Sequence, residues 1–427
     1  MKQTMKLIPA AILALSAGSA VASAFQLLEQ NASGLGNAYA GSAAVADNAS
    51  TIFFNPAGMT QLQPREISAG LTAVLTSYEF TNSGSSTGAL TGSGGDPGGL
   101  GLIPNGYLSW ALNKDLYVGV GFGAPFGLKT DYDNPWLGGA QAIKFDIKTY
   151  NINPSIAYRV NNMVSLGFGV DWQRMEAEYV RIAGVNPAPI AGVVPVPLTS
   201  TTVQLKADDD SWGWNAGVLL NLSPSTKVGV SYRSSVKHKL DGSLTASGPA
   251  ALAAFHVSQS GPATADIELP ETFIISATQA INSQWEMLGD ISWTGWSSID
   301  KVDVVRANGT VAQTLDTKFR DTWRVALGAN YKLSDSLKLK FGTAYDQTPI
   351  RDPEHRLVSL PDNNRVWLST GAQWKPNKAS ALDLGLTYLY VKDPDINNNQ
   401  SGSLRGLVKG SYSDSAWIFG AQYSMSF

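Results

Sequence analysis

The chain of 427 residues contains no cysteine and only three histidines. Disulfides, thiolate nucleophiles and cysteine-ligated metals are therefore excluded, and a histidine-rich metal site is disfavoured. Charged residues make up 15% of the chain, below the roughly 25% of soluble domains. The net charge of −3 gives no basis for nucleic-acid binding. We therefore expect no cofactor, no metal and no nucleic-acid partner.

Long apolar runs are also missing. No stretch approaches the roughly 18 uninterrupted apolar residues of a transmembrane helix. The chain also lacks the G-x-x-x-x-G-K loop that binds nucleotide phosphates, so we expect no nucleotide-driven step.

The N-terminus has the features of a secretory signal. Lys2 and Lys6 precede an apolar run over residues 7–17, which is too short to span a bilayer. Ala22-Ser23-Ala24 then has the small-x-small form that signal peptidase cleaves. We predict a signal peptide over residues 1–24, cleaved at its end or two residues earlier. A retained membrane anchor is the alternative.

The end of the chain alternates strictly between two kinds of side chain. One face carries large apolar residues, namely Trp417, Phe419, Ala421, Tyr423, Met425 and Phe427. The other face is mostly small or polar, and the same period of two recurs near 164–173, 212–221 and 322–332. A soluble sandwich would pack the large side chains inward. The pattern instead favours a membrane barrel with an apolar band facing lipid.

Short and long connections alternate along the chain from residue 64. The short polar turns lie at 113–115, 161–162, 223–225, 282–283, 334–335 and 376–378. The long connections lie near 81–100, 125–142, 183–204, 241–262, 300–316, 346–362 and 391–410. Thirteen connections join fourteen strands, and this alternation is typical of outer-membrane barrels. We predict an all-β fold, a 14-stranded antiparallel transmembrane β-barrel over 64–427. The strands at 163–182 and 202–222 exceed the ~10 residues that cross a membrane and should project beyond it.

The segment that precedes the barrel has a different composition. Residues 25–63 are rich in Gly, Ala, Ser and Asn, and Glu29 and Asp47 are the only charges between Phe25 and Thr60. The segment is too apolar for a disordered tail, and its small residues suit close contact with other backbone. Because a fourteen-strand barrel has a wide lumen, we predict an N-terminal hatch that plugs it. A periplasmic extension is the alternative.

Several motifs carry a family resemblance across the whole mature chain. They are AFQLLEQNASGLGNAYAGSAAVADNASTIFFNPAGM at 24–59, GWNAGVLLNL at 213–222, VGVSYRSSVK at 228–237, LPETF at 269–273 and FRDTWRVALG at 319–328. In these motifs the chain resembles the long-chain fatty acid transporters of Gram-negative outer membranes and their relatives that import aromatic hydrocarbons. The resemblance implies a 14-stranded barrel with an N-terminal hatch. It also implies passive import in three steps: capture by extracellular loops, transfer to a lumen site through the hatch, and lateral release at a gap in the third strand.

Two long connections are unusually apolar for surface loops, at 183–198 and 246–255. Exposed apolar surface often marks a binding site. We interpret Val194, Leu198, Leu252 and Phe255 as part of a landing groove for a lipid-like ligand, in agreement with the capture site that the resemblance implies. Alternatively, the two loops pack on each other as a lid.

The resemblance also implies a lumen site. It places Phe25 against the ligand chain and Arg181 on the ligand carboxylate, which a guanidinium can bind through two hydrogen bonds. The second basic residue of the family, a lysine, aligns near Leu315 and is absent. Lys318 or Arg320 could replace it, and its absence makes a neutral aromatic or aliphatic hydrocarbon the alternative substrate.

The third strand is weakened by alternate glycines and ends at a proline, which cannot donate a ladder hydrogen bond. The predicted lateral opening comprises Gly119, Gly121, Gly123 and Pro125, and the hatch gate that we expect to face it comprises Asn55, Pro56, Ala57 and Gly58. The alternative is that these glycines only relieve crowding against the hatch.

Other functions have less support. A lipase-like barrel enzyme would use His238, His256 or His355, but no Ser and Asp constellation is evident near them in sequence. A general porin is a further alternative. We interpret the run 208–210 of three aspartates as a solvated strand end rather than a site for a divalent ion or lipopolysaccharide. Besides its hydrophobic ligand, we expect the chain to contact outer-membrane lipid and lipopolysaccharide, to engage the barrel-assembly machinery through Phe427, and to be a monomer.

Overall fold

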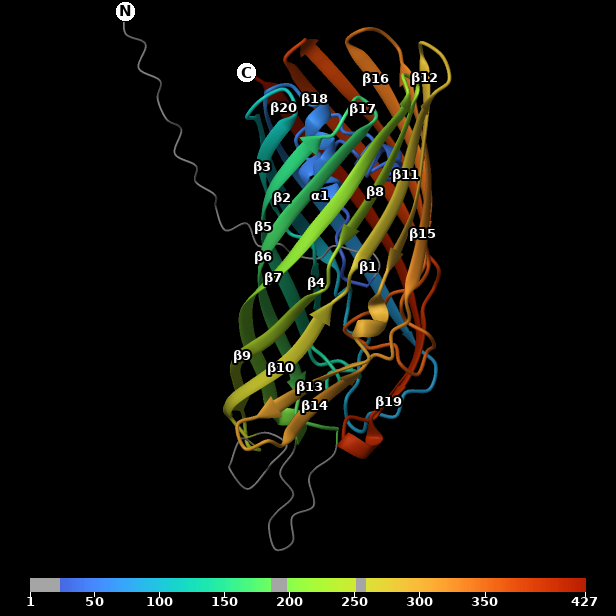
Figure 1. Ribbon diagram of the computed structural model, residues 1–427. Helices are drawn as coiled ribbons and strands as arrows, with labels where there is room; N and C mark the ends of the chain where they lie inside the picture. Colours follow the sequence, from blue (N-terminus) through green and yellow to red (C-terminus); the bar gives the residue numbers. More distant parts are fainter. Residues whose placement is uncertain (1–23, 186–197, 251–258) are drawn as a thin grey trace, which may run out of the picture.

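The alternating segments pair into one antiparallel sheet that closes on itself in the computed structural model, which describes residues 24–185, 198–250 and 259–427 (Figure 1). Strand β1 (Arg65–Asn82) pairs with β2 (Gly99–Ala111) on one side and with the last strand, β20 (Leu407–Ser426), on the other. Because the first and last strands pair, the sheet closes into a barrel. The predicted closed barrel is therefore confirmed.

Fourteen strands form the wall, and six of them are interrupted. The continuous ones are β1, β2, β5 (Lys144–Arg159), β6 (Val164–Ile182), β7 (Thr202–Ser223), β16 (Leu337–Asp346), β17 (Arg365–Asn377) and β20. The interrupted ones are β3 (Leu116–Gly123) with β4 (Gly127–Asp131), β8 (Thr226–Arg233) with β9 (Val236–Ser247), β10 (Gly261–Leu269) with β11 (Thr272–Ala280), β12 (Trp285–Thr294) with β13 (Lys301–Arg306), β14 (Val311–Asp316) with β15 (Thr322–Lys332), and β18 (Ser380–Val391) with β19 (Asp395–Asn399). The strand number agrees with the prediction.

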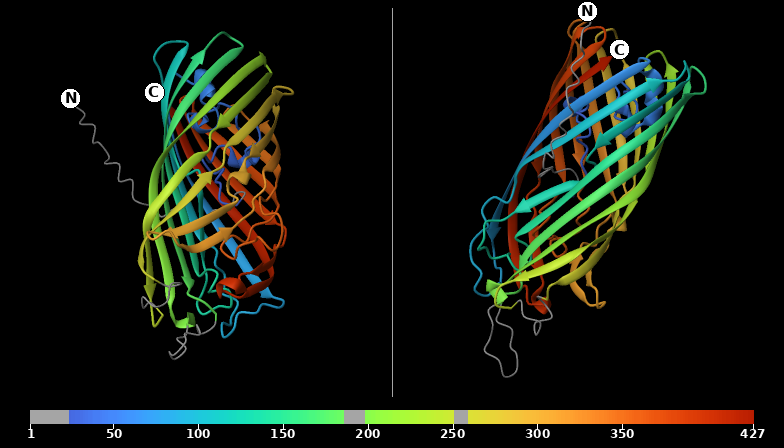
Figure 2. Two further views of the ribbon diagram at one scale, coloured as in Figure 1. Left: turned by 60° about the horizontal axis from the view of Figure 1, so that its bottom comes forward. Right: turned by 90° about the vertical axis from the view of Figure 1, so that its left-hand side faces the viewer.

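The long connections gather at one end of the barrel, here called the loop end, and the short turns at the other (Figure 2). Three predicted loops are partly strand, and the first is 125–142, which contains β4. The segment 300–316 contains the hairpin of β13 and β14, and 391–410 contains β19. In β13, Val302 and Val304 alternate with more exposed neighbours, so the period of two continues past the expected strand end.

The outer surface changes character along the two longest strands. Outward residues of the turn-side half are apolar and exposed, for example Phe168 in β6 and Trp214 in β7. Past Trp212 the outward positions carry charge instead, and Arg174 pairs with Asp208 at 2.9 Å and with Asp210 at 3.4 Å. An apolar band that ends in charges fits strands that project beyond the lipid. The ion pairs agree with a solvated strand end at 208–210.

Helices are short in the described part of the chain. They are η1 (Leu35–Asn37), α1 (Thr51–Phe54), η2 (Pro56–Gln61), η3 (Leu198–Ser200), η5 (Trp296–Ser298) and η6 (Ser401–Ser403). Among the described residues, no helix has the length and apolar character needed to cross a membrane.

The N-terminal segment lies within the barrel, where Figure 1 shows it in blue behind the front strands. Glycines of the wall make room for its backbone. A Cβ added to Gly167 would lie 2.1 Å from the Ala57 nitrogen, and one added to Gly217 would lie 2.1 Å from Oδ1 of Asn55. Any larger side chain would collide with the segment at these positions. This placement is consistent with the predicted hatch.

Candidate functional site

Cationic side chains of the barrel wall hold the N-terminal segment by its backbone carbonyls. Lys340 Nζ donates to the Ser33 carbonyl at 2.7 Å while it pairs with Asp383, also at 2.7 Å. Three further contacts of this kind are Arg159 to Thr60, Arg233 to Phe53, and Arg324 to Ala38. Since each carbonyl receives a charged donor, these bonds are stronger than neutral ones and fix the segment to the wall.

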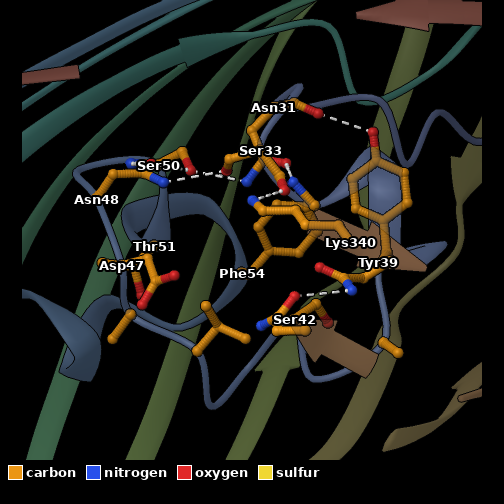
Figure 3. Close-up of a pocket in the computed structure, with 16 residues that line it drawn as sticks. Asn31, Ser33, Tyr39, Ser42, Asp47, Asn48, Ser50, Thr51, Phe54 and Lys340 are labelled. Atoms are coloured by element: carbon orange, nitrogen blue, oxygen red, sulfur yellow. Dashed lines mark hydrogen bonds between the residues drawn. The ribbon is translucent and has the colours of Figure 1, made fainter. Parts of the chain in front are cut away.

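The segment also carries its own polar network, drawn in Figure 3. Asn31 donates to the Ser50 hydroxyl at 2.7 Å, Asn48 donates to the Ser33 hydroxyl at 3.0 Å, and the Tyr39 hydroxyl donates to the Asn31 carbonyl at 2.8 Å. Asn and Ser side chains satisfy backbone and side-chain groups that a short irregular segment leaves unpaired. The composition that distinguishes residues 25–63 in the sequence therefore has a structural cause.

A narrow cavity of about 70 Å³, here called the inner cavity, lies between the N-terminal segment and the loop end. Its apolar lining includes Phe25, Phe145, Ile147, Met175, Leu205, Leu240, Ile267, Val302, Leu315, Phe319 and Leu357. The Phe25 ring is 5.0 Å from Trp296 and 5.9 Å from Phe126, centroid to centroid, and is 4% exposed. Apolar cavities of about 150 Å³ bind benzene. A long acyl chain therefore fits here only if the lining moves.

Arg181 lies beside this cavity at the loop end of β6, beyond the apolar outer band. Its guanidinium is 2% exposed and donates through Nε to Gln313, a cavity-lining residue, at 2.7 Å. It also donates through Nη1 to the carbonyls of Ile182 at 3.0 Å and Ala183 at 3.2 Å. Burial, reinforced by the charge of Arg405, lowers the pKa of Arg181 to about 9, so it stays charged at neutral pH. No described carboxylate forms an ion pair with it.

The two candidates for the absent basic residue lie elsewhere. Lys318 is paired with Asp300 at 2.8 Å, and Arg320 donates to the Thr348 carbonyl at 3.3 Å. Leu315, the aligned position, lines the inner cavity. The positive charge that acts on Arg181 comes instead from Arg405 and Arg306. Neither was expected, because both belong to connections far from Arg181 in sequence.

The third strand is broken between β3 and β4. Strand β2 pairs with β3 only from Gly106 to Ala111, and β4 pairs with β5 alone. Residues 99–105 of β2 consequently have no strand partner on this side within the described chain. The wall therefore loses its hydrogen-bond ladder at 124–126, here called the break, in the predicted third strand.

The start of the N-terminal segment is bonded to the break. Leu27 N donates to the Pro125 carbonyl, and Gly127 N donates to the Phe25 carbonyl, both at 2.8 Å. The Gln30 side chain donates to the Ala124 carbonyl at 2.7 Å and accepts from Ala124 N at 3.1 Å. Residues 25–30 thus line the inner cavity through Phe25 and close the break through Gln30.

The expected gate residues, 55–58, pack on the barrel wall and on their own segment. Asn55 donates to the Val218 carbonyl of β7 at 3.0 Å and accepts from Ala57 N at 3.1 Å, and Pro56 and Ala57 pack on Gly167 of β6. Gly58 packs on Thr51 of its own segment. Residues 55–57 therefore lie against β6 and β7, while η2 also contacts β3, and the gate role of 55–58 stays a prediction. Asn55 caps η2, which fixes this part of the segment against β6 and β7.

The glycines of the third strand show close approach. A Cβ on Gly119 would lie 2.7 Å from both Ile52 and Met59, one on Gly121 would lie 2.9 Å from Tyr107, and one on Gly123 would lie 2.4 Å from Gln30 Oε1. These contacts support the alternative that the glycines relieve crowding, while the interruption itself begins after Gly123 and includes Pro125.

The apolar loops are only partly described. Leu198 is buried against Gly184. Val194, Leu252, Phe255 and His256 lie outside the described residues, so the landing groove stays a prediction.

Comparisons with known proteins agree with this architecture. The sequence model of the family described as outer membrane protein transport protein (OMPP1/FadL/TodX) matches residues 13–427. The long-chain fatty acid transport protein of Salmonella typhi is 31% identical over 443 residues, which cover 98% of this chain and 97% of that one. Among solved structures, a Pseudomonas aeruginosa FadL homologue superposes with a TM-score of 0.86 at 22% identity, over 95% of this chain and 100% of that one. The Ralstonia pickettii toluene transporter TbuX gives 0.67 at 18% identity, over 93% and 98%.

Proposed function

We propose that this chain, which belongs to the outer membrane protein transport protein family (OMPP1/FadL/TodX), carries hydrophobic compounds across the outer membrane, and long-chain fatty acids in particular. One observation carries the proposal: a buried guanidinium without a described carboxylate partner lies beside an apolar cavity. A fatty acid supplies both complements, an apolar chain and an anionic head group. The name of the Salmonella typhi relative points to the same substrate class.

The proposed route has three steps. The apolar loops at 183–198 and 246–255 capture the ligand, the inner cavity receives its chain against Phe25, and the ligand leaves sideways through the break into the membrane. Because residues 25–30 are bonded to the break, they must detach before release. Lateral exit keeps the chain out of water, which would cost about 0.8 kcal/mol for each exposed CH₂. The process is passive and follows the concentration gradient.

A neutral hydrocarbon is the second candidate substrate. Leu315 stands where the resembling family has a basic residue, and it contributes only apolar surface to the inner cavity. A ligand without a head group would then fill the cavity and leave Arg181 bonded to Gln313, as it is in the structure.

An enzymatic role has no support in the described residues. His238 is bonded to Asp209 and Gln173, and His355 to Asp352, and no serine joins either ring within the described ranges. We propose a transporter without catalytic activity.

The chain organisation belongs to the same proposal. We propose a cleaved signal peptide over 1–24, a hatch over 25–63 and a barrel over 64–427 that acts as a monomer surrounded by outer-membrane lipid and lipopolysaccharide. Phe427 lies exposed past β20 and is available to the barrel-assembly machinery.

Ligand binding to the purified barrel tests the proposal. Oleate and toluene are titrated against the wild type and Arg181→Ala, with Arg320→Ala as a matched control, because Arg320 bonds the Thr348 carbonyl whereas Arg181 bonds the cavity-lining Gln313. We expect oleate to bind the wild type and Arg320→Ala alike and to bind Arg181→Ala about 10-fold or more weakly, because a charged hydrogen bond is lost. Preferential binding of toluene, unaffected by Arg181→Ala, would make the chain a hydrocarbon importer. Failure of both ligands to bind would refute the proposal.

A further inference from the structure

A second, open cavity of about 950 Å³, here called the outer groove, lies between β14 and the connection from β19 to β20. Its lining includes Gln313, Glu354, Leu357, Asn398, Leu404 and Arg405. Gln313 and Leu357 also line the inner cavity, so the two spaces adjoin at these side chains. The outer groove is formed by other elements than the loops at 183–198 and 246–255.

Arg405 is the buried cation of the outer groove. Its side chain is 6% exposed and donates to Gln400 Oε1 and to the Ala312 carbonyl, both at 3.2 Å. Its Nε has no hydrogen-bond partner among the described residues. Arg181, on the side of the inner cavity, donates a hydrogen bond to Gln313, the residue that follows Ala312 in β14. Two guanidinium groups from distant parts of the chain therefore converge on consecutive residues of β14.

A third guanidinium adds to the positive charge of this region. Arg306, at the end of β13, is 8% exposed, donates to the Gln259 carbonyl and leaves Nη2 without a partner in the described chain. None of the three arginines forms an ion pair with a described carboxylate. Buried charges are costly unless they are paired. An anion that enters the outer groove would offset that cost.

The carboxylates of the outer groove already have partners. Asp316 lies 3.9 Å from both Lys318 and His355, and Glu354 accepts a hydrogen bond from Asn397 at 3.1 Å. Both acidic side chains are exposed, so solvent screens the repulsion that they would exert on an incoming anion. The buried charge of the groove is therefore positive and lies at Arg405.

We propose that the outer groove is a second binding site for long-chain carboxylates, in which Arg405 holds the head group while the acyl chain extends past Gln313 and Leu357 toward the inner cavity. The inference rests on the proposed function. The site would give the transport route a second entrance. Selectivity for acids would then come from Arg405, which is far in sequence from Leu315, the position aligned with the absent lysine.

The first test compares oleate with oleyl alcohol, which has the same chain without the charge. In Arg405→Gln the outer-groove site should bind oleate about 10-fold or more weakly, so that the variant binds fewer oleate molecules than the wild type at the same concentration, while oleyl alcohol binding is unchanged; Arg405→Lys should restore most of the lost oleate binding. Equal oleate stoichiometry and affinity of Arg405→Gln and the wild type overturn the inference. An equal loss for the alcohol also overturns it, since the residue would then act on the chain or the fold. Absence of binding of either compound to the wild type refutes the proposed function instead.

A second variant leaves all three arginines intact. Gly402 lines the outer groove and has no atom within 4 Å of an added Cβ, so Gly402→Trp should fold and obstruct the groove. Ser401→Trp is the matched control, because the adjacent Ser401 is exposed and does not line the groove. Heat-modifiable migration in gels verifies folding. Weaker oleate binding by Gly402→Trp alone supports the inference. Equal binding by both variants contradicts it.

Discussion

Replacing Gln30 with leucine should loosen the contact between the N-terminal segment and the break. Gln30 is fully buried, and its side chain bonds both the N–H and the carbonyl of Ala124, which is itself buried. Leucine has a similar size but no polar atoms, so both Ala124 groups lose their partner, and the Leu27 carbonyl loses the bond that Gln30 donates to it at 3.0 Å. An unpaired buried group costs about 1–3 kcal/mol, which gives about 2–6 kcal/mol for the pair. Even the lower figure corresponds to about a 30-fold larger population of the detached state.

Hydrogen exchange measures this population directly. Amides of 25–31 and 123–127 should exchange about 30-fold faster in Gln30→Leu, while those of β6 and β20 keep their protection. Gln141→Leu is the matched control, because buried Gln141 also donates to two carbonyls, those of Asn398 at 3.0 Å and Gly406 at 3.2 Å, but lies away from the break. Unchanged exchange at 25–31 in Gln30→Leu, or an equal gain over the whole barrel, would refute the reasoning.

Two further predictions concern the N-terminal segment inside the barrel. Gly167→Val should lower the melting temperature of the detergent-solubilised barrel, because its Cβ would lie 2.1 Å from the Ala57 nitrogen and overpacking costs about 1–3 kcal/mol or more. Gly106→Val is the control and should not lower the melting temperature, because a Cβ added there has no atom within 4 Å. Equal melting temperatures of the two variants would argue against close contact at Ala57. Proteoliposomes that contain the wild type should swell in sugar solutions no faster than empty ones, because residues 24–63 fill the turn-side lumen; rapid swelling would indicate a general porin instead.

The wall was more predictable from sequence than the site. The spacing of the turns predicts the number of strands and the closed barrel. The period of two predicts which side chains face outward, such as the exposed Trp417, and which face inward, such as the buried Gln422. The interruption of the third strand was visible too, because Gly123 and Pro125 are local signals. Where the alternation continued into β13 and β19, the expected loops were wrong.

Contacts between distant segments were not predictable in the same way. Nothing local in the sequence says that Asn55 faces β7 or that Gln30 bonds the break, since both depend on how an irregular segment packs in the lumen. Arg405 was missed for the same reason: it follows a polar loop, and only the closed barrel brings it near Arg181. Irregular segments lack the periodicity that assigns strand residues to a face.

On the proposed route, residues 25–30 must leave the break for the ligand to pass into the membrane. Gln26 and Phe126 lie opposite each other in an isolated antiparallel bridge, and the chain has no other cysteine to compete with an engineered pair. Gln26→Cys/Phe126→Cys therefore ties the segment to the break when oxidised and frees it when reduced. Ser68→Cys/Ser424→Cys, whose native hydroxyl oxygens are 2.9 Å apart between β1 and β20, is the control.

Uptake of labelled oleate by cells that carry each pair is the decisive measurement. The oxidised Gln26→Cys/Phe126→Cys barrel should take up no oleate above background and should recover on reduction, while the control pair should be unaffected by either condition. Full uptake through the oxidised first pair, with its disulfide verified by mass spectrometry, would contradict the proposed route.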